Sequence, residues 1–369
     1  MDKKILESAI LKLGQSADLL ASFKADPSGV GAGLGLDAHW ADVIFRGERN
    51  LLRSAGVNDG ITILVSRWFQ DNLSDSSSSD KFVFDGRMST EVPDVLDNIV
   101  FAGGCSHVPD LLARPEIDPP EAIARLEQAY ARLKSALEAA RPDVIVATTD
   151  CHFQSFQTGA FVVGVGSEHA GSMEFFKRAD LDLQLKGDAQ FAEQIVAGAR
   201  AENLEVEAAP VVNLDHGLIV PLRLALPSKD IPVVPIVTQP HRSYSPFGAR
   251  AFGQALRKAI AGSGKRVALL ATGGLSHWLD PGKFGAVDTS FDGYILDMLK
   301  HGRGLDLANL EPYPLLDHGQ YEFLNWLIVL GALGPGLKAD VYAYEPLQAS
   351  GGGWTVLNMN VDAQRVAHV

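Results

Sequence analysis

The chain has 369 residues, of which 46% are hydrophobic and 21% are charged, values close to those of an ordinary globular protein. This length allows one substantial core and a smaller appendage. A formal net charge of -13 and a pI near 5.2 would repel nucleic-acid phosphates and anionic membrane surfaces, so we expect neither as a partner.

The two cysteines, Cys105 and Cys151, form no Cys-x-x-Cys pair of the kind that binds zinc or carries redox chemistry. We therefore expect free thiols in a reducing compartment. The first residues lack the apolar run of a secretory signal, and no stretch reaches the roughly 18 apolar residues of a membrane helix. Together these features predict a cytoplasmic protein.

Apolar residues recur at three- and four-residue spacings over residues 4–24, which predicts a helix that stops before a glycine-rich stretch. Asp37 is a candidate N-cap of a second helix, and the apolar residues 61–69 favour a third. Three short helices cannot bury all their apolar sides alone, so we expect them to pack on the rest of the protein. We assign residues 1–70 to a small, all-helical cap domain.

Residues 71–97 are rich in serine and aspartate, with scattered glycine and proline, which is typical of a flexible linker. From residue 98 onward, short β-rich runs alternate with helical patterns. This alternation predicts an α/β catalytic domain over residues 98–369, with a central mixed or parallel sheet flanked by helices. The clearest strands are expected at 99–102, 144–147, 233–237 and 267–270, and the clearest helices at 119–140 and 321–333.

Three of the expected strands end in a short polar or glycine-containing segment followed by a histidine, and these are His107, His152 and His277. Ligands gather at the carboxyl ends of strands in open α/β sheets, so the three side chains can converge on one site. Two imidazoles and one carboxylate leave open positions on a metal, as non-haem Fe(II) requires to activate dioxygen. His107 and His152 are the candidate nitrogen ligands. Glu322 is the candidate carboxylate, because core packing poorly explains an acidic residue that leads an apolar helix.

Five segments, in order, resemble motifs of the class III extradiol ring-cleaving dioxygenases related to protocatechuate 4,5-dioxygenase. They are Cys105-Ser106-His107-Val108-Pro109, Asp150-Cys151-His152-Phe153, Leu214-Asp215-His216-Gly217, Gly273-Gly274-Leu275-Ser276-His277 and Glu322-Phe323-Leu324-Asn325-Trp326. The resemblance covers about residue 98 to the C terminus. More weakly, Phe23-Lys24-Ala25-Asp26-Pro27 resembles part of that enzyme's small helical subunit, which implies that both subunits are fused in one chain.

The resemblance implies that His107, His152 and Glu322 hold Fe(II). It also implies that His277 is the acid/base residue and that His216 is a second histidine near the substrate. The activity it implies is opening of a catechol-type ring with O2.

The resemblance further places the substrate beside these motifs, with Thr149, Phe153 and Ser276 as the expected contacts. One departure concerns the second ligand, where the family often has Asn-Asp-His and this chain reads Thr149-Asp150-Cys151-His152. Protocatechuate, gallate and hydroxypyridone-like compounds are the candidate substrates. A symmetric homodimer is the expected assembly.

Other interpretations of the same residues stay open at this point. Two histidines and a glutamate also bind Zn²⁺, which would activate water for hydrolysis. The same scaffold could serve a non-catalytic binding protein. Individually, Glu322 could complement a helix dipole, and Asp215-His216-Gly217 could be a turn that hydrogen-bonds itself.

Overall fold

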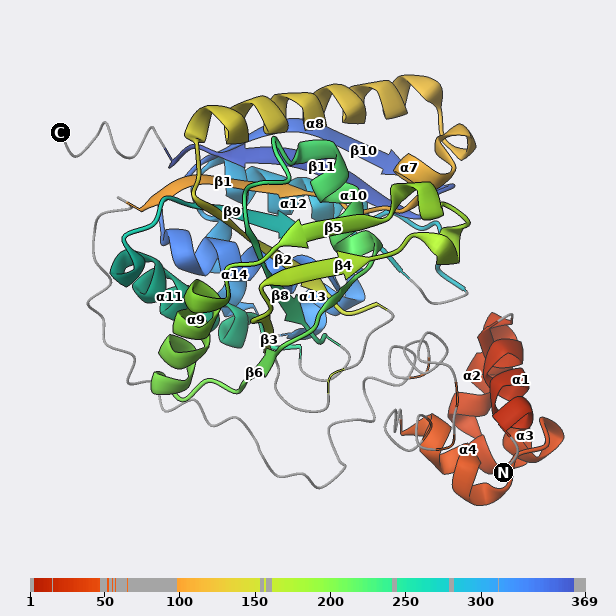
Figure 1. Ribbon diagram of the computed structural model, residues 1–369. Coiled ribbons are helices and arrows are strands. Elements are labelled where there is room, and N and C mark those ends of the chain that lie inside the picture. The colour runs from red at the N-terminus through yellow and green to blue at the C-terminus, as the bar shows by residue number, and fades with distance from the viewer. Residues whose placement is uncertain are drawn as a thin grey trace. The chain divides into compact units, whose positions relative to one another are not determined.

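The computed structural model describes residues 3–14, 16–46, 98–152, 161–240, 244–278, 282–310 and 312–361, together with Leu52, Ala55, Val57, Val65 and Phe156. The chain divides into two compact units: the second comprises residues 89–151, 156–277 and 285–369, and the first comprises residues 1–88 with the short segments 152–155 and 278–284. The first unit is helical and the second is an α/β structure (Figure 1). The expected linker, 71–97, and nearly all of the third expected helix, 61–69, lie outside the described residues.

The described part of the helical unit contains α1 (Lys3–Gly14), α2 (Ala17–Ala25), α3 (Pro27–Gly33) and α4 (Ala38–Phe45). Their apolar side chains pack on one another in a core of their own, and its fully buried members include Leu6, Ile10, Leu13, Phe23 and Ile44. These side chains therefore bury one another, and the expected packing of the helices on the rest of the protein stays a prediction.

The helix expected over residues 4–24 is in fact two helices. Ser16 begins the second one, because its hydroxyl accepts a hydrogen bond from the Leu19 N–H. The glycine-rich stretch, expected to end a helix, forms α3, which Asp26 caps and in which Pro27 takes the first position. α4 begins after the expected cap, Asp37.

An eight-stranded mixed sheet forms the centre of the α/β unit, in the order β10-β11-β1-β9-β2-β8-β3-β6. Its pairs β1/β9, β9/β2, β2/β8 and β3/β6 are parallel, and the other three pairs are antiparallel. The strands are β1 (Ile99–Cys105), β2 (Val144–Asp150), β3 (Phe161–Gly164), β6 (Val206–Ala209), β8 (Val233–Thr238), β9 (Val267–Thr272), β10 (Ala339–Leu347) and β11 (Gly352–Met359). A second sheet contains β4 (Glu168–Gly171), β5 (Leu183–Lys186) and β7 (Asn213–Leu214). All four predicted strands and the predicted α/β class are confirmed.

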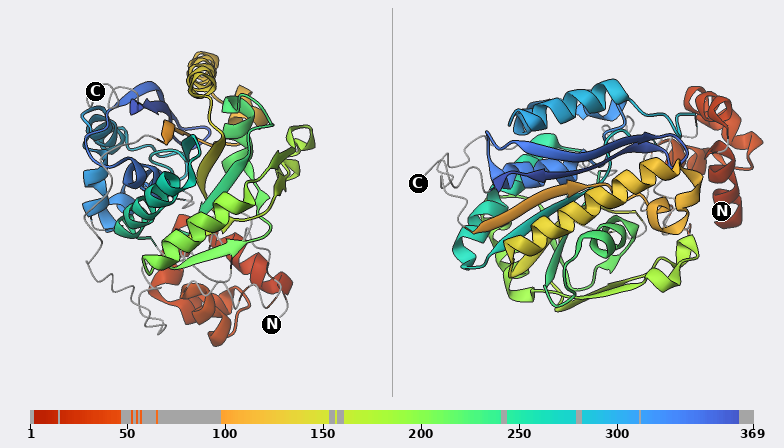
Figure 2. Two further views of the ribbon diagram at one scale, coloured as in Figure 1. Left: turned by 60° about the vertical axis from the view of Figure 1, so that its left-hand side comes forward. Right: turned by 90° about the horizontal axis from the view of Figure 1, so that it is seen from above.

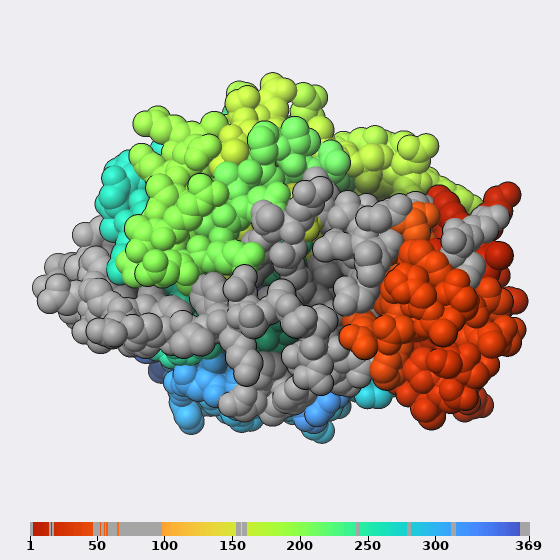
Figure 3. All heavy atoms as spheres, turned by 90° about the horizontal axis from the view of Figure 1, so that it is seen from below, coloured from red at the N-terminus to blue at the C-terminus, as the bar shows by residue number. Residues whose placement is uncertain are grey.

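Helices flank the large sheet, as predicted (Figure 2). α8 (Pro120–Ala140) packs on β1, β10 and β11, and α10 (His216–Ala225) packs on β2 and β9. α14 (Phe323–Leu333) also packs on β2 and β9, and it contacts α11 (Pro246–Ser263). α9 (Ala189–Ala201) packs on β3 and β6, and its exposed side chains contribute to the surface seen in light green in Figure 3.

The remaining helices are short, apart from α12 (Thr289–Lys300), which packs on β10. In the part of the chain that the structure describes, they are α7 (Asp110–Ala113), α13 (Pro312–Asp317) and four 3₁₀ turns at Pro115–Ile117, Glu174–Phe176, Ala179–Leu181 and Gly304–Asn309. Among the described residues, no helix combines the length and the apolar character needed to cross a lipid bilayer.

The register of the central strands brings three loops to one edge of the sheet. Every residue of β1, β2, β8 and β9 is buried, as expected for strands covered on both faces. β9 pairs in parallel with both β1 and β2, and Cys105 is the partner of Thr272 at the end of the β1 ladder. The loops that follow β1, β2 and β9 therefore start side by side.

Candidate active site

The structure brings the three predicted metal ligands together at this edge. One ligand atom from each of His107, His152, Glu322 and Asp150 lies within 4.8 Å of the others. His107 Nε2 is 3.2 Å from Glu322 Oε1 and 3.8 Å from Asp150 Oδ1. His152 is half-buried and the other three are buried. Asp150 belongs to the second motif, but it was not predicted to be a ligand.

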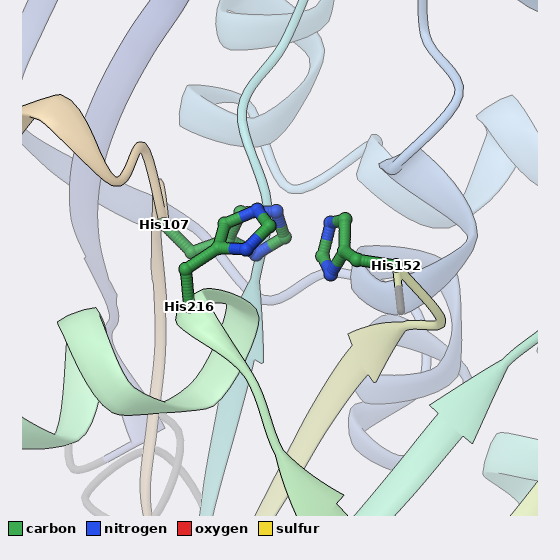
Figure 4. A group of neighbouring side chains, drawn as sticks. All are labelled: His107, His152 and His216. Atoms are coloured by element: carbon green, nitrogen blue, oxygen red, sulfur yellow. The ribbon is translucent and has the colours of Figure 1, made fainter. Parts of the chain in front are cut away.

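His216 lies at the same place, as Figure 4 shows for the three histidine rings. A nitrogen of His216 is within 4.8 Å of nitrogens of His107 and His152, and its ring meets the ring of His107 edge-on, with the centroids 5.6 Å apart. His216 is the first residue of α10, which Asp215 caps by accepting the Gly217 N–H. The segment thus forms the self-bonded turn that the sequence allowed, and that turn directs His216 toward the site.

A hydrogen-bond chain determines which nitrogen of His107 carries a proton. The Thr272 hydroxyl donates its one hydrogen to Gly217 O at 2.8 Å. It therefore accepts from His107 Nδ1, which is 3.1 Å away. Nδ1 then carries the proton, and Nε2 presents its lone pair to the carboxylates. Lone pairs of an imidazole and a carboxylate 3.2 Å apart repel each other unless a cation or a proton lies between them, so this donor set fits a metal ion.

Glu322 is supported by the loop that follows β9. The Gly274 N–H donates to Glu322 Oε2. Gly273 has a φ of +130°, and a Cβ there would lie 2.7 Å from the Cβ of Glu322, so only glycine fits. Glu322 occupies the N-cap position of α14, yet its side chain makes no capping hydrogen bond. Its carboxylate therefore belongs to the candidate site at the edge of the sheet and does not cap the helix.

Asn325, the third residue of α14, ties this helix to three strands. Its amide oxygen accepts from Thr238 Oγ1 at 2.8 Å, and its amide nitrogen donates to Thr272 O at 3.0 Å. Its backbone carbonyl accepts from Thr148 Oγ1. Asn325 is fully buried, so these bonds satisfy its polar groups and hold the start of α14, with Glu322, against the strand ends. The sequence placed Asn325 in a motif but did not predict this role.

His277 is held at the far end of the loop that supports Glu322. Its Nδ1 lies 2.7 Å from Gly351 O, and its backbone N–H donates to Gly319 O. A carbonyl can only accept, so Nδ1 carries the proton of the neutral ring. Nε2 is then the nitrogen able to accept a proton. The ring lies 5.5 Å from that of Trp354 and is partly buried.

The three expected substrate contacts differ in their surroundings. Phe153 lies outside the described residues. Thr149 is buried, with its hydroxyl 3.4 Å from the carbonyl oxygen of Asp150. Ser276 is fully buried, and its hydroxyl donates to Asp292 and accepts from the Asp288 N–H. The Ser276 hydroxyl therefore makes its hydrogen bonds inside the protein. It supports the loop and does not face a substrate.

Cys105 and Cys151 are buried beside the site and form no disulfide bond. Burial raises the pKa of Cys105 to about 12, because the thiolate would lose its hydration. Cys105 therefore stays a thiol at neutral pH. A protonated thiol is neither a nucleophile nor a metal ligand, so histidines and carboxylates are the relevant donors here.

Comparison with known proteins identifies the family. A family model described as "Catalytic LigB subunit of aromatic ring-opening dioxygenase" matches residues 102–355, which is more than half of the chain. The chain is 29% identical over 167 residues to the 2,3-dihydroxyphenylpropionate/2,3-dihydroxicinnamic acid 1,2-dioxygenase of Rhodococcus rhodochrous, covering 43% of this chain and 51% of that protein.

Two further relatives are similar at the same level. The 2-aminophenol 1,6-dioxygenase beta subunit of a Pseudomonas species is 29% identical over 186 residues, covering 47% of this chain and 60% of that protein. The gallate dioxygenase of Pseudomonas putida is 28% identical over 167 residues, covering 43% and 49%. The matches span about half to three fifths of these relatives. On the match over residues 102–355, the chain belongs to the family of LigB catalytic subunits of aromatic ring-opening dioxygenases.

Proposed function

We propose that the protein is an Fe(II)-dependent extradiol dioxygenase that opens a catechol-type ring with O2. The observation that carries the proposal is the grouping of His107, His152, Glu322 and Asp150 within 4.8 Å at the strand ends of a LigB-family domain. Two imidazoles with a carboxylate are the donor set of non-haem iron oxygenases. When bound, Fe(II) would hold the aromatic diol and O2 side by side and let electrons pass between them.

In this proposal His107, His152 and Glu322 hold the metal, and Asp150 lies beside them as a further carboxylate. His277 moves protons: Nδ1 stays bonded to Gly351 O, while Nε2 takes a proton from a substrate hydroxyl and later returns it. An unperturbed imidazole pKa near 6.5 suits both directions of transfer. His216 lies beside the aromatic substrate in this proposal, which its edge-on contact with His107 supports.

The substrate class is proposed as a vicinal diol or a close analogue, such as a protocatechuate-like, gallate-like or hydroxypyridone-like ring. Relatives are named for dihydroxyphenylpropionate, aminophenol and gallate, all of which carry neighbouring oxygen or nitrogen substituents on an aromatic ring. Neighbouring heteroatoms can bind one metal together. A panel of such rings, read by O2 uptake and the yellow colour of ring-opened products, tests the proposal. It fails if Fe(II)-loaded protein takes up no O2 with any member.

Two substitutions separate the proposed roles. We expect Glu322→Ala to lose iron, because it removes the carboxylate closest to His107 Nε2. We expect His277→Phe to keep iron and to lose most turnover, because the ring volume remains while the proton-accepting nitrogen is gone. Full iron occupancy in Glu322→Ala would remove that residue from the site. Near-normal turnover in His277→Phe would remove the acid/base role.

A zinc hydrolase is the second candidate, and one observation favours it: His107, His152 and His216 also form a group with nitrogens within 4.8 Å. Three imidazoles are a common zinc-binding set for activating water. Oxygen uptake separates the two activities, because a hydrolase consumes none. Metal analysis separates both from a non-catalytic binding protein, which would be recovered without stoichiometric metal.

We further propose that residues 1–70 correspond to a small helical subunit fused to a catalytic domain over residues 98–369. Support comes from the separate core of the helical unit and from the family match, which begins only at residue 102. One relative is itself named a beta subunit. A protease site inserted at Ser76–Ser79 tests the idea: cut fragments should co-elute and retain turnover. Sedimentation of the uncut protein tests the proposed homodimer. A cytoplasmic location is also proposed, because the two cysteines form no disulfide bond.

A further inference from the structure

A buried carboxylate on α12 joins three segments of the α/β unit. Asp292 is fully buried and accepts four hydrogen bonds. Its Oδ1 accepts from the Ser276 N–H at 2.9 Å and from Gln320 Nε2 at 2.7 Å. Its Oδ2 accepts from the hydroxyls of Ser276 and Tyr344, both at 2.7 Å. Each donor comes from a different part of the chain except for the two of Ser276.

The segments that meet at Asp292 include both functional loops. Ser276 directly precedes His277, and Gln320 lies two residues before Glu322. Tyr344 belongs to β10, at the edge of the sheet. The backbone agrees with the side chains, because the His277 N–H also donates to Gly319 O. One carboxylate therefore fixes the loop of the proposed acid/base residue against the loop of the proposed metal ligand.

Burying this carboxylate is unfavourable in itself. Loss of hydration raises the pKa of Asp292, and its hydrogen bonds to Ser276, Tyr344 and Gln320 oppose that shift. Apolar side chains of similar volume often stabilise a protein as well as a buried polar network does. What four directed hydrogen bonds add is a defined geometry, which a proton-transfer residue needs.

We propose that Asp292 is a positioning residue that sets His277 in place relative to Glu322. It acts through Ser276 on one side and Gln320 on the other, and it contacts neither substrate nor metal itself. The inference deepens the proposed ring-opening function and rests on it. It also accounts for Ser276, whose hydroxyl serves this network.

The chemistry of the four donors provides a conservative variant. Both partners of Oδ1 are N–H groups, which can only donate, and both partners of Oδ2 are hydroxyls, which can also accept. In Asp292→Asn the amide oxygen can replace Oδ1, and the amide nitrogen can donate to the two hydroxyls. This variant removes the charge and keeps the hydrogen bonds, whereas Asp292→Ala removes both.

The experiment compares turnover per bound iron in these two variants. We expect Asp292→Ala to lower kcat on the order of 100-fold, the effect of a misplacement of about 1 Å, with KM for the catechol little changed. Asp292→Asn should restore most of that kcat. Asp297→Asn is the matched control, because Asp297 lies on the same helix with a side chain that is 68% exposed. Equal kcat in wild type and Asp292→Ala would overturn the proposal, as would an Asn variant as impaired as the Ala variant.

Single-bond variants keep the test decisive if Asp292→Ala fails to fold. Ser276→Ala removes the hydrogen bond next to His277, and Tyr344→Phe removes one from the edge strand. We expect the loss of kcat to be larger in Ser276→Ala, and the reverse order would contradict the proposal. If the wild type itself takes up no O2 with any catechol, the proposed function fails. That result differs from a failure of the positioning role, which is measured by comparing variants with an active wild type.

Discussion

Thr272 supports the candidate metal site through a hydrogen bond to the proposed ligand His107. Its hydroxyl accepts from His107 Nδ1 and donates to Gly217 O, so it directs the lone pair of Nε2 toward Glu322. Groups that hold a ligating histidine in this way typically contribute 10- to 100-fold to metal affinity. We expect Thr272→Val to weaken Fe(II) binding by about that factor. Anaerobic titration with Fe(II) measures the change.

The control for this variant is Thr289→Val, an exposed threonine at the start of α12. It makes the same chemical change away from the site, so its iron affinity should match that of the wild type. An unchanged affinity in Thr272→Val would mean that Thr272 does not orient His107.

His169 is a buried titratable residue on β4 and is not among the proposed ligands. It is 2% exposed, and neither ring nitrogen has a hydrogen-bond partner among the residues that the structure describes. Its ring fits against two glycines, since a Cβ at Gly187 would lie 2.8 Å from Nε2 and one at Gly164 would lie 2.9 Å from Cε1. Burial lowers the pKa of His169, because the charged form would lose its hydration.

This lowered pKa predicts acid sensitivity. Below the ordinary histidine pKa of about 6.5, the unfolded chain binds a proton that the folded protein does not. Stability therefore decreases as the pH is lowered from about 6.5 to the folded-state pKa. For one proton the slope is at most about 1.4 kcal/mol per pH unit. Urea unfolding over this window should show a steeper loss for the wild type than for His169→Phe. Parallel curves for the two proteins would exclude His169 as the cause.

At the scale of elements, the α/β part of the chain was well predicted from sequence. β1, β2, β8 and β9 are buried apolar runs, and α8 carries a clear apolar stripe, so local composition identifies them. The helical unit was predicted less well. Ser16 caps a new helix inside an apparently continuous pattern, and Asp26 with Pro27 starts a helix in a glycine-rich segment. In both places a local hydrogen bond outweighs the periodicity.

The contact between α14 and β1 requires a glycine at position 104, because there is no room for a Cβ there. A Cβ at Gly104 would collide with the indole ring of Trp326, whose Nε1 donates to Gly273 O. Gly104→Ala should therefore push on α14, which begins just after Glu322. We expect a loss of about 1–3 kcal/mol in the free energy of unfolding, the usual cost of overpacking, together with weaker iron binding.

Gly262→Ala is the control for this variant, because a Cβ there meets nothing within 4 Å and the residue lies inside α11. That substitution should stabilise the protein by roughly 0.5–1 kcal/mol, since alanine loses less conformational freedom than glycine in a helix. Chemical denaturation measures both variants. If Gly104→Ala were as stable as the wild type, the close packing of β1 on Trp326 would not be a constraint.

At the scale of the whole molecule, the proposed ligands lie far apart in sequence. Strand-end position indicated His107 and His152. Glu322 was indicated by its place at the start of an apolar helix and by resemblance, because no spacing relates it to the histidines. Asp150, Thr272 and Asn325 were not assigned, since their roles follow from the order in which the strands pair. Sheet order is set by contacts between distant residues, and local patterns carry little information about it. The residues that hold the proposed ligands in place through tertiary contacts therefore could not be predicted from sequence.

This dispersion predicts that metal stabilises the folded α/β unit as a whole. The ligand atoms within 4.8 Å come from loops after β1 and β2 and from the start of α14, so unfolding must separate them. A ligand bound only by the folded state adds about 2.7 kcal/mol when its concentration is 100 times its Kd. Anaerobic denaturation with and without Fe(II) should show this increase for the wild type. The increase should be absent in Glu322→Ala, because that variant cannot complete the site. An equal increase in both proteins would place the stabilising iron somewhere else in the molecule.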